Sequence, residues 1–164
     1  MSESYVCCFT GHRHIHGVDM QELSGAFDNV IDRLVAGGVD TFISGGAIGF
    51  DIYAALKVIE RKREYPRIRL HLYLPCRDQT QRWSGSDREA YGYMLENADK
   101  VIYTSEKYTR ECMLHRDRRM VDDSDFCVAF CQRAFGGTAY TLNYARSKDI
   151  RIVNLATMLR EENK

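Results

Sequence analysis

Short apolar runs alternate along the chain with longer segments in which apolar residues recur at every third or fourth position. The first run covers residues 5–9, and Leu23, Phe27 and Ile31 belong to the first repeat. A short apolar run between turn residues indicates a strand, whereas the longer repeat indicates one face of a helix. The pattern predicts strands at residues 5–9, 41–44, 68–74, 100–103, 125–131 and 150–155. It predicts helices at residues 20–36, 47–62, 88–98, 110–121 and 138–147, and a last short helix that reaches the C-terminus.

This alternation of strands and helices predicts an α/β fold. Strands joined by helices of this length form parallel βαβ units, and helices then cover the sheet on both faces. We therefore expect a Rossmann-like three-layer αβα sandwich with a mostly parallel sheet. The sequence contains no internal repeat, low-complexity tract or linker, so a single domain should span residues 1–164.

The unusual residues of the sequence collect where predicted strands end. They occupy residues 10–16, 44–51, 75–83 and 132–138, which follow the first, second, third and fifth strands. The carboxyl ends of parallel strands meet at one edge of the sheet, and open α/β folds bind their ligands there. The sequence therefore predicts a ligand site at this edge.

The segment SGGAIGFD, residues 44–51, places three glycines at the start of the second predicted helix. Gly45, Gly46 and Gly49 could let a phosphate approach the free N–H groups of that helix, where the helix dipole also favours an anion. They could instead form only a tight strand-to-helix turn. Asp51 could interact with the helix dipole or accept hydrogen bonds from a sugar hydroxyl. The glycine spacing matches neither a Walker A loop nor the usual dinucleotide fingerprint.

Other loops of the same edge supply further candidates for ligand contact. Residues 136–138, GGT, form a second glycine-rich helix start. Arg13 could bind a phosphate with two hydrogen bonds. Trp83, the only tryptophan, could stack on a base or cover the core. His12 could donate to a ligand or stack on it, although a loop histidine more often has a structural role.

Composition and charge narrow the class of protein. Lys plus Arg and Asp plus Glu each total 23, so the net charge is zero and we do not expect nucleic acid as a partner. No apolar run approaches the roughly 18 residues of a membrane span, and the N-terminus lacks the layout of a signal peptide. We therefore expect a cytoplasmic protein without membrane contact. Its six cysteines are expected to be free thiols, and no metal site is expected.

Several motifs together resemble the SLOG superfamily, which contains the DprA single-strand DNA-binding proteins and the LOG nucleotide hydrolases. The motifs are FTGHR, SGGAIGFD, LPC, RDRRMVDDSD and GGT, starting at residues 9, 44, 74, 116 and 136. They span nearly the whole chain in the order of the family, and they are most similar to the YpsA/YspA-like branch. The resemblance implies a Rossmann-like sheet and a pocket for a nucleotide or nucleotide-derived ligand, often in a homo-oligomer.

One departure from the hydrolase branch bears on function. In LOG enzymes a catalytic glutamate follows the second glycine loop, whereas residues 135–143 read FGGTAYTLN and contain no carboxylate. Arg116 and Met120 do match the block that precedes this loop in LOG enzymes. Cleavage of an N-glycosidic bond generally benefits from a carboxylate. Three residues could supply one, and the sequence does not select among them: Asp51, Asp122 and Asp123.

The leading hypothesis is a sensor-type protein that binds a nucleotide or an ADP-ribose-like molecule. AMP, NAD or an ADP-ribose-like molecule is the candidate bound nucleotide, and no cofactor or catalytic residue is assigned. The alternatives are a LOG-like phosphoribohydrolase of nucleoside monophosphates and a DprA-like single-strand DNA-binding protein. Arg116 and Arg119 share a helix face, and one of them is expected to face the pocket. The candidate ligand-binding residues are Gly11, His12, Arg13, Ser44, Gly45, Gly46, Ala47, Gly49, Asp51, Pro75, Trp83, Arg116, Arg119, Met120, Gly136, Gly137 and Thr138.

Overall fold

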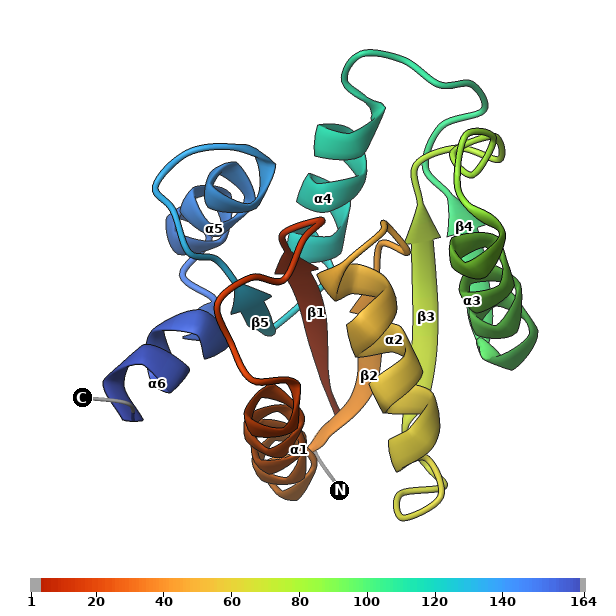
Figure 1. Cartoon of the computed structure of the whole chain (residues 1–164). Helices are drawn as coiled ribbons and strands as arrows, with labels where there is room; N and C mark the ends of the chain where they lie inside the picture. Colours follow the sequence, from red (N-terminus) through yellow and green to blue (C-terminus); the bar gives the residue numbers. More distant parts are fainter. Residues whose placement is uncertain (1–3, 163–164) are drawn as a thin grey trace.

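The computed structural model describes residues 4–162 of the chain. Its centre is an all-parallel sheet in the order β4-β3-β2-β1-β5-β6 (Figure 1). Each strand lies within two residues of its predicted position, so the predicted α/β fold is confirmed. The strands are β1 (Tyr5–Gly11), β2 (Val39–Ser44), β3 (Arg69–Leu74), β4 (Lys100–Tyr103), β5 (Phe126–Phe130) and β6 (Arg151–Asn154).

Helices cover both faces of this sheet, which makes the three-layer sandwich that the sequence predicts (Figure 1). Four of them pack on one face, where α1 contacts α6 and α2 contacts α3. The other two, α4 and α5, contact each other on the opposite face. The helices are α1 (Met20–Ala36), α2 (Phe50–Arg61), α3 (Gly85–Asn97), α4 (Cys112–Asp122), α5 (Gly137–Ser147) and α6 (Leu155–Glu162).

The sheet separates two apolar cores. On the side of α1 and α2, the ring of Phe9 stacks on Phe27 and Phe42 with centroids 5.5 and 5.9 Å apart. The other core lies beneath α4 and α5. Cys7 belongs to the first core and its neighbour Cys8 to the second, because successive side chains of a strand point to opposite faces. All six cysteines are buried free thiols.

Local capping explains where three of the helices begin. The Asp19 carboxylate accepts hydrogen bonds from two N–H groups in the first turn of α1, as the sequence predicts. Helix α3 begins three residues earlier than expected, because Ser84 caps it and accepts a hydrogen bond from the Asp87 N–H. Helix α2 begins three residues later than expected, because Gly49 has a φ of 93° and cannot continue a helix.

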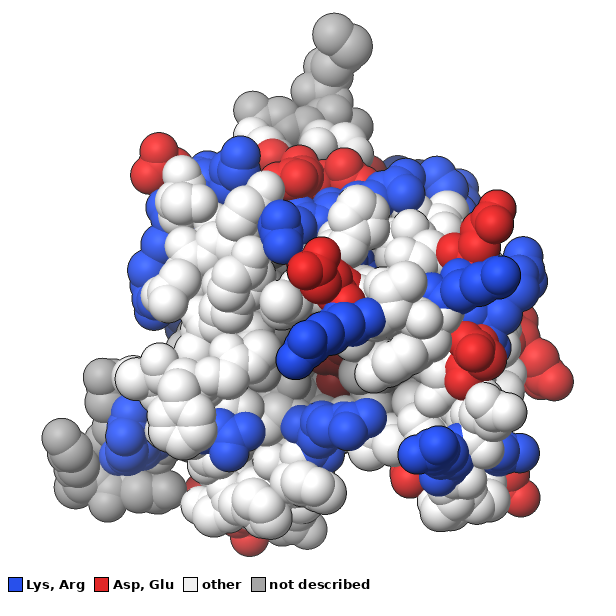
Figure 2. Space-filling model, turned by 90° about the horizontal axis from the view of Figure 1, so that it is seen from above, with Lys and Arg blue, Asp and Glu red and all other residues white. Residues whose placement is uncertain are grey.

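The strand order reverses at β1, which pairs with β2 on one side and β5 on the other. The loops after β1, β2, β3 and β5 therefore share one edge of the sheet. Figure 2 looks onto this edge from above and shows Lys and Arg side chains distributed across it.

No helix between residues 4 and 162 combines the length and the apolarity needed to cross a membrane. Across the same residues, no group of three or more His, Cys, Asp or Glu side chains is placed to hold a metal ion.

Candidate ligand-binding site

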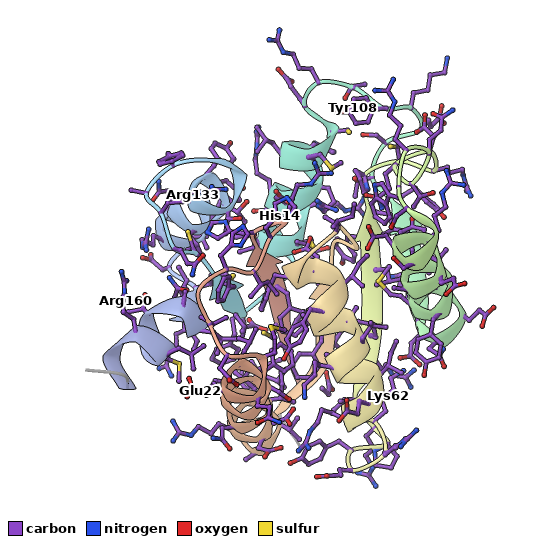
Figure 3. The ribbon with its side chains drawn as sticks, viewed as in Figure 1. His14, Glu22, Lys62, Tyr108, Arg133 and Arg160 are labelled. Atoms are coloured by element: carbon purple, nitrogen blue, oxygen red, sulfur yellow. The ribbon has the colours of Figure 1, made fainter. Side chains whose placement is uncertain are left out.

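A pocket of about 680 Å³ lies at the carboxyl edge of the sheet, above β1, β2 and β3. This volume is typical of small-molecule sites. In Figure 3 the pocket residues His14 and Tyr108 lie at this edge, whereas Lys62, beyond the end of α2, lies toward the opposite edge. The pocket is lined by Arg13 and His14 after β1, Ile48 after β2, Asp78, Gln79, Gln81, Arg82 and Trp83 after β3, and Tyr108 and Met113 after β4.

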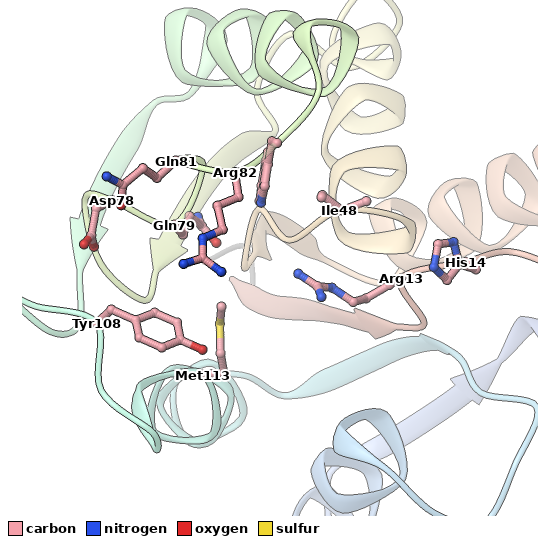
Figure 4. Close-up of a pocket in the computed structure, with 10 residues that line it drawn as sticks. Arg13, His14, Ile48, Asp78, Gln79, Gln81, Arg82, Tyr108 and Met113 are labelled. Carbon is pink, nitrogen blue, oxygen red and sulfur yellow. The ribbon is translucent and has the colours of Figure 1, made fainter.

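Two arginines approach the pocket from different walls. In Figure 4 the guanidinium groups of Arg13 and Arg82 both point into the space between their loops. Both side chains are exposed, and no hydrogen bond or ion pair holds either guanidinium in the part of the chain that the structure describes. A guanidinium binds phosphate or carboxylate through two parallel hydrogen bonds. The two arginines can therefore bind an anionic group from two sides.

Aromatic and apolar side chains form other parts of the wall. Trp83 is half-buried, and its ring meets the Tyr91 ring edge-on with centroids 5.3 Å apart. Trp83 also packs against the core, so it both covers the core and lines the pocket. Tyr108 is 62% exposed, and Ile48 and Met113 add apolar surface. These walls suit the flat faces of a base or the carbon side of a sugar.

The polar residues of the β3–α3 loop were not among the predicted site residues. Asp78, Gln79, Gln81 and Arg82 all line the pocket, and Asp78 is its carboxylate. One signal in the sequence could have found them, because ten residues separate β3 from α3. Connections in such folds usually have about two to six residues, and longer loops are often functional.

In the loop after β2, Gly49 is the glycine nearest to α2, and the packing of the backbone around it leaves no room for a side chain. A Cβ at Gly49 would overlap the carbonyl oxygens of His12 and Arg13. The Phe50 N–H donates to the His12 carbonyl oxygen at 3.0 Å. The loop after β1 therefore packs against the start of α2, the helix start at which the glycines could admit a phosphate or form only a tight turn.

The other two glycines of this loop also touch protein atoms. A Cβ at Gly45 would lie 2.5 Å from Arg116 Nη1, and one at Gly46 would lie 2.7 Å from a Leu74 methyl group. The Ser44 hydroxyl donates to the Asp51 carbonyl oxygen at 2.7 Å and accepts from the Gly46 N–H at 3.2 Å. The loop is thus closed by its own hydrogen bonds, and it contributes only Ile48 to the pocket wall.

Asp51 lies beneath the loops and is 5% exposed. Burial raises the pKa of its carboxyl group to about 7; nearby Asp117 also raises it, and Arg116 opposes the shift. The backbone amides of Ala47 and Gly11 favour the charged form of this carboxyl group and so lower its pKa. Asp51 therefore lies close to the first two loops, and it does not line the pocket.

His12 joins the loops that follow β1 and β5. Its Nε2 accepts a hydrogen bond from the Gln132 N–H at 2.8 Å, and the backbone N–H of His12 donates to the Phe130 carbonyl oxygen at 3.3 Å. Burial lowers the pKa of the imidazole, with a further contribution from Arg133. A neutral ring is the form that can accept through Nε2. His12 is therefore a structural link at the point where the strand order reverses.

The second glycine loop is open, unlike the first. Gly136 has a φ of 97°, and a Cβ at Gly136 or Gly137 would meet nothing within 4 Å. No side chain caps α5, and Thr138 is 9% exposed in its first turn. This helix start can accept an anion, but none of its residues lines the 680 Å³ pocket.

The remaining candidates lie outside the pocket wall. Arg116 and Met120 are buried, and so is Pro75 at the end of β3. Arg119 is exposed and lies 5.7 Å from the centroid of the Tyr73 ring. Among the candidate residues, Arg13 and Trp83 line the pocket. A ligand-binding role for the others stays a prediction.

The carboxylates that could serve a hydrolase are also distant from this wall. Asp122 accepts a hydrogen bond from the Tyr144 hydroxyl at 2.7 Å, and Asp123 accepts one from the Tyr73 hydroxyl at 2.6 Å. Both residues lie at the C-terminal end of α4, whereas the N-terminal part of that helix reaches the pocket through Met113.

Several curated proteins are similar to this chain. A UPF0398 protein of Halalkalibacterium halodurans is 30% identical over 137 residues, which cover 78% of this chain and 72% of that protein. The SPbeta prophage-derived protein YoqJ of Bacillus subtilis is 31% identical over 117 residues, which cover 64% of this chain and 68% of YoqJ.

Two solved structures share the fold. DNA processing protein A of Helicobacter pylori, solved to show its single-stranded DNA binding mode, matches with a TM-score of 0.65 at 15% identity, over 97% of this chain and 73% of that one. DNA processing protein A of Streptococcus pneumoniae matches with a TM-score of 0.53 at 12% identity, over 95% of this chain and 60% of that one.

The prediction that nucleic acid is not a partner is wrong. The solved structures that match this chain are DNA processing proteins, and one of them was solved for its binding of single-stranded DNA. Net charge is a sum over the whole surface, so a value of zero does not exclude basic side chains at one edge. Although the total charge is zero, Lys and Arg side chains are spread across the carboxyl edge (Figure 2). The exposed arginines in its loops include Arg13, Arg77, Arg82 and Arg133.

A model of one protein family matches residues 8–158, which is most of the chain. The match includes the pocket and the loops that support it. It agrees with the similarity to the UPF0398 protein and with the Rossmann-like sheet. The chain therefore belongs to the YspA SLOG family.

Proposed function

We propose that this protein binds a nucleotide or an ADP-ribose-like molecule in the pocket above β1, β2 and β3. The observation that carries the proposal is a pair of arginines, Arg13 and Arg82, that approach one pocket with aromatic side chains in its wall and whose guanidinium groups have no partner among residues 4–162. Phosphate groups would bind the two guanidinium groups. The base or sugar would lie against Trp83 and Tyr108. SLOG membership agrees with this assignment.

Binding without bond cleavage is the function that this wall supports best. Asp78 is the carboxylate that lines it, and no lysine is among the lining residues. The hydrolase alternative would need Asp78 or a rearrangement that exposes Asp51. It is tested by incubating the protein with AMP and measuring free adenine by chromatography, and we expect release at the background rate.

Calorimetric titration with AMP, ADP-ribose, NAD and adenosine tests the proposal. The phosphorylated ligands should bind more tightly than adenosine, because adenosine offers the arginines no anion. Arg13→Lys keeps the charge but loses the paired geometry of the guanidinium, so it should weaken AMP binding and leave adenosine binding nearly unchanged. Arg160→Lys is the matched control, because Arg160 is an exposed arginine on α6, far from the pocket (Figure 3). Equal affinity for AMP and adenosine would contradict the proposal.

Single-stranded nucleic acid is a second candidate ligand. It is favoured by the fold shared with the DNA-binding protein of Helicobacter pylori and by the exposed arginines of the carboxyl edge. Fluorescence anisotropy with a labelled oligonucleotide tests it. Binding should weaken steeply as salt rises, because each phosphate contact releases counterions. Affinity that does not depend on salt, or no binding at low salt, would contradict this candidate.

The homo-oligomer that the resemblance implies stays a separate prediction, which light scattering can test.

A further inference from the structure

Gln79 combines burial, a fixed position and an unused acceptor in the wall of the pocket. Its side chain is 9% exposed, and its Nε2 donates to the Tyr91 hydroxyl at 3.3 Å. Its Oε1 is buried and has no hydrogen-bond partner among the described residues. A buried amide oxygen without a partner is costly, so such atoms often mark the place of a missing ligand or water.

The Gln79 Oε1 differs in its location from the other buried side-chain atoms that lack a hydrogen-bond partner among the described residues. The other described residues with such an atom are Asp28, Tyr53 and Arg61, none of which lines the pocket. Gln79 also lies beside the aromatic part of the wall, because its partner Tyr91 contacts Trp83 edge-on. An acceptor beside an aromatic wall is placed to contact the edge of a base whose face lies on that wall.

We propose that Gln79 determines the specificity of the pocket by accepting a hydrogen bond from an amino group on the base of the ligand. This inference rests on the proposed nucleotide binding. Tyr91 holds the carboxamide through Nε2, which leaves Oε1 to interact with the ligand. Gln79 and Arg82 both line the pocket (Figure 4).

The test compares two ligands that differ in one amino group. AMP carries a 6-amino group, and purine riboside 5′-monophosphate lacks it. Calorimetry should show that the wild-type protein binds AMP about tenfold more tightly. In Gln79→Met the ratio should fall to about one, with little change for purine riboside 5′-monophosphate. Gln79→Glu keeps an acceptor oxygen and should retain the preference, even if the added charge weakens both ligands. Tyr91→Phe removes the anchor but keeps the ring, so it should reduce the preference.

Each result decides between defined alternatives. If the wild-type protein binds both ligands equally, the specificity role is wrong although the proposed nucleotide site stands. If neither ligand binds, the proposed function fails and this inference fails with it. A preference that survives in a cooperatively folded Gln79→Met variant would assign the amino group to another residue. If 2′-deoxy-AMP binds less tightly than AMP to the wild-type protein but not to Gln79→Met, the donor is a sugar hydroxyl and the base assignment is wrong.

Discussion

Arg116 donates a hydrogen bond from its guanidinium to the carbonyl oxygen of Gly45, 71 residues earlier in the chain. Arg116 belongs to α4 and is 3% exposed, whereas Gly45 begins the glycine-rich loop after β2. The same guanidinium pairs with Asp117, with Nε and Oδ1 2.6 Å apart. The buried guanidinium of Arg116 therefore connects α4 to the loop after β2, which contributes Ile48 to the pocket wall. The glycine leaves the space that the guanidinium occupies.

The first prediction concerns this contact. Gly45→Ala places a methyl group 2.5 Å from Arg116 Nη1, so the guanidinium must move away from its carbonyl partner. We expect the free energy of unfolding to fall by about 2–4 kcal/mol, because a buried charge then loses a hydrogen bond. Denaturant unfolding measures this loss. Gly25→Ala is the control, because a Cβ at Gly25 in α1 meets nothing within 4 Å and should stabilise the helix by roughly 0.5–1 kcal/mol. Equal effects of the two changes would contradict the proposed contact.

The second prediction concerns the buried carboxyl group of Asp51. Its pKa is raised to about 7 in the folded protein, so the folded state holds the proton more tightly than the unfolded state does. The stability that this proton contributes is fully present below about pH 4 and is lost as the pH rises through 7. Asp51→Asn removes this titration. The stability of the variant relative to wild type should therefore increase between pH 4 and pH 8, by at most about 4 kcal/mol.

Urea unfolding at several pH values measures this dependence. Asp149→Asn is the control, because Asp149 is exposed and its φ of 58° suits asparagine. This variant controls for the exchange of an aspartate for an asparagine at the surface. A constant difference in stability between Asp51→Asn and wild type would show that Asp51 does not titrate between pH 4 and pH 8.

The strands and most helices could be predicted because each carries a local signal. A buried strand such as β5 is an apolar run, and α1 has both a cap at Asp19 and an apolar face. The start of α2 could not be placed in this way, because Ala47 and Ile48 extend the apolar helical pattern. Helix α2 begins only after Gly49, whose φ of 93° is not helical. The first N–H of the helix, that of Phe50, donates to the His12 carbonyl group in the loop after β1, and sequence periodicity does not show this contact.

The edge that holds the candidate site could be predicted from topology, but most of its wall could not. Arg13 was found because it follows a strand directly and carries a charge suited to phosphate. Gln79, Arg82 and Tyr108 lie in longer loops, and the loop after β3 is held by hydrogen bonds to residues of α3. The two glycine-rich loops also differ in structure. The loop at residues 44–51 packs against other protein atoms, whereas that at residues 136–138 is open. Sequence spacing does not distinguish these cases.

The third prediction uses Trp83 as a reporter of the pocket. It is the only tryptophan of the chain, and it lines the pocket. AMP bound there should change the intrinsic tryptophan fluorescence, and the change should saturate with the dissociation constant found by calorimetry. Trp83→Phe should lose the signal while it keeps an aromatic wall and most of the affinity. Heat of binding without a fluorescence change would place the ligand elsewhere, for example at the open start of α5.

The last prediction compares one glycine from each glycine-rich loop. Gly49→Ala would force a side chain into a φ of 93° and against the carbonyl oxygens of two neighbouring residues, so we expect a loss of about 3 kcal/mol or more. Gly137→Ala adds a methyl group in open space within the first turn of α5, where alanine favours the helix by roughly 0.5–1 kcal/mol. Thermal and denaturant unfolding of both variants measure the two effects. If Gly49→Ala were as stable as wild type, the loop after β1 could not be packed against the start of α2 as the structure has it. The start of α2 would then be open to a phosphate.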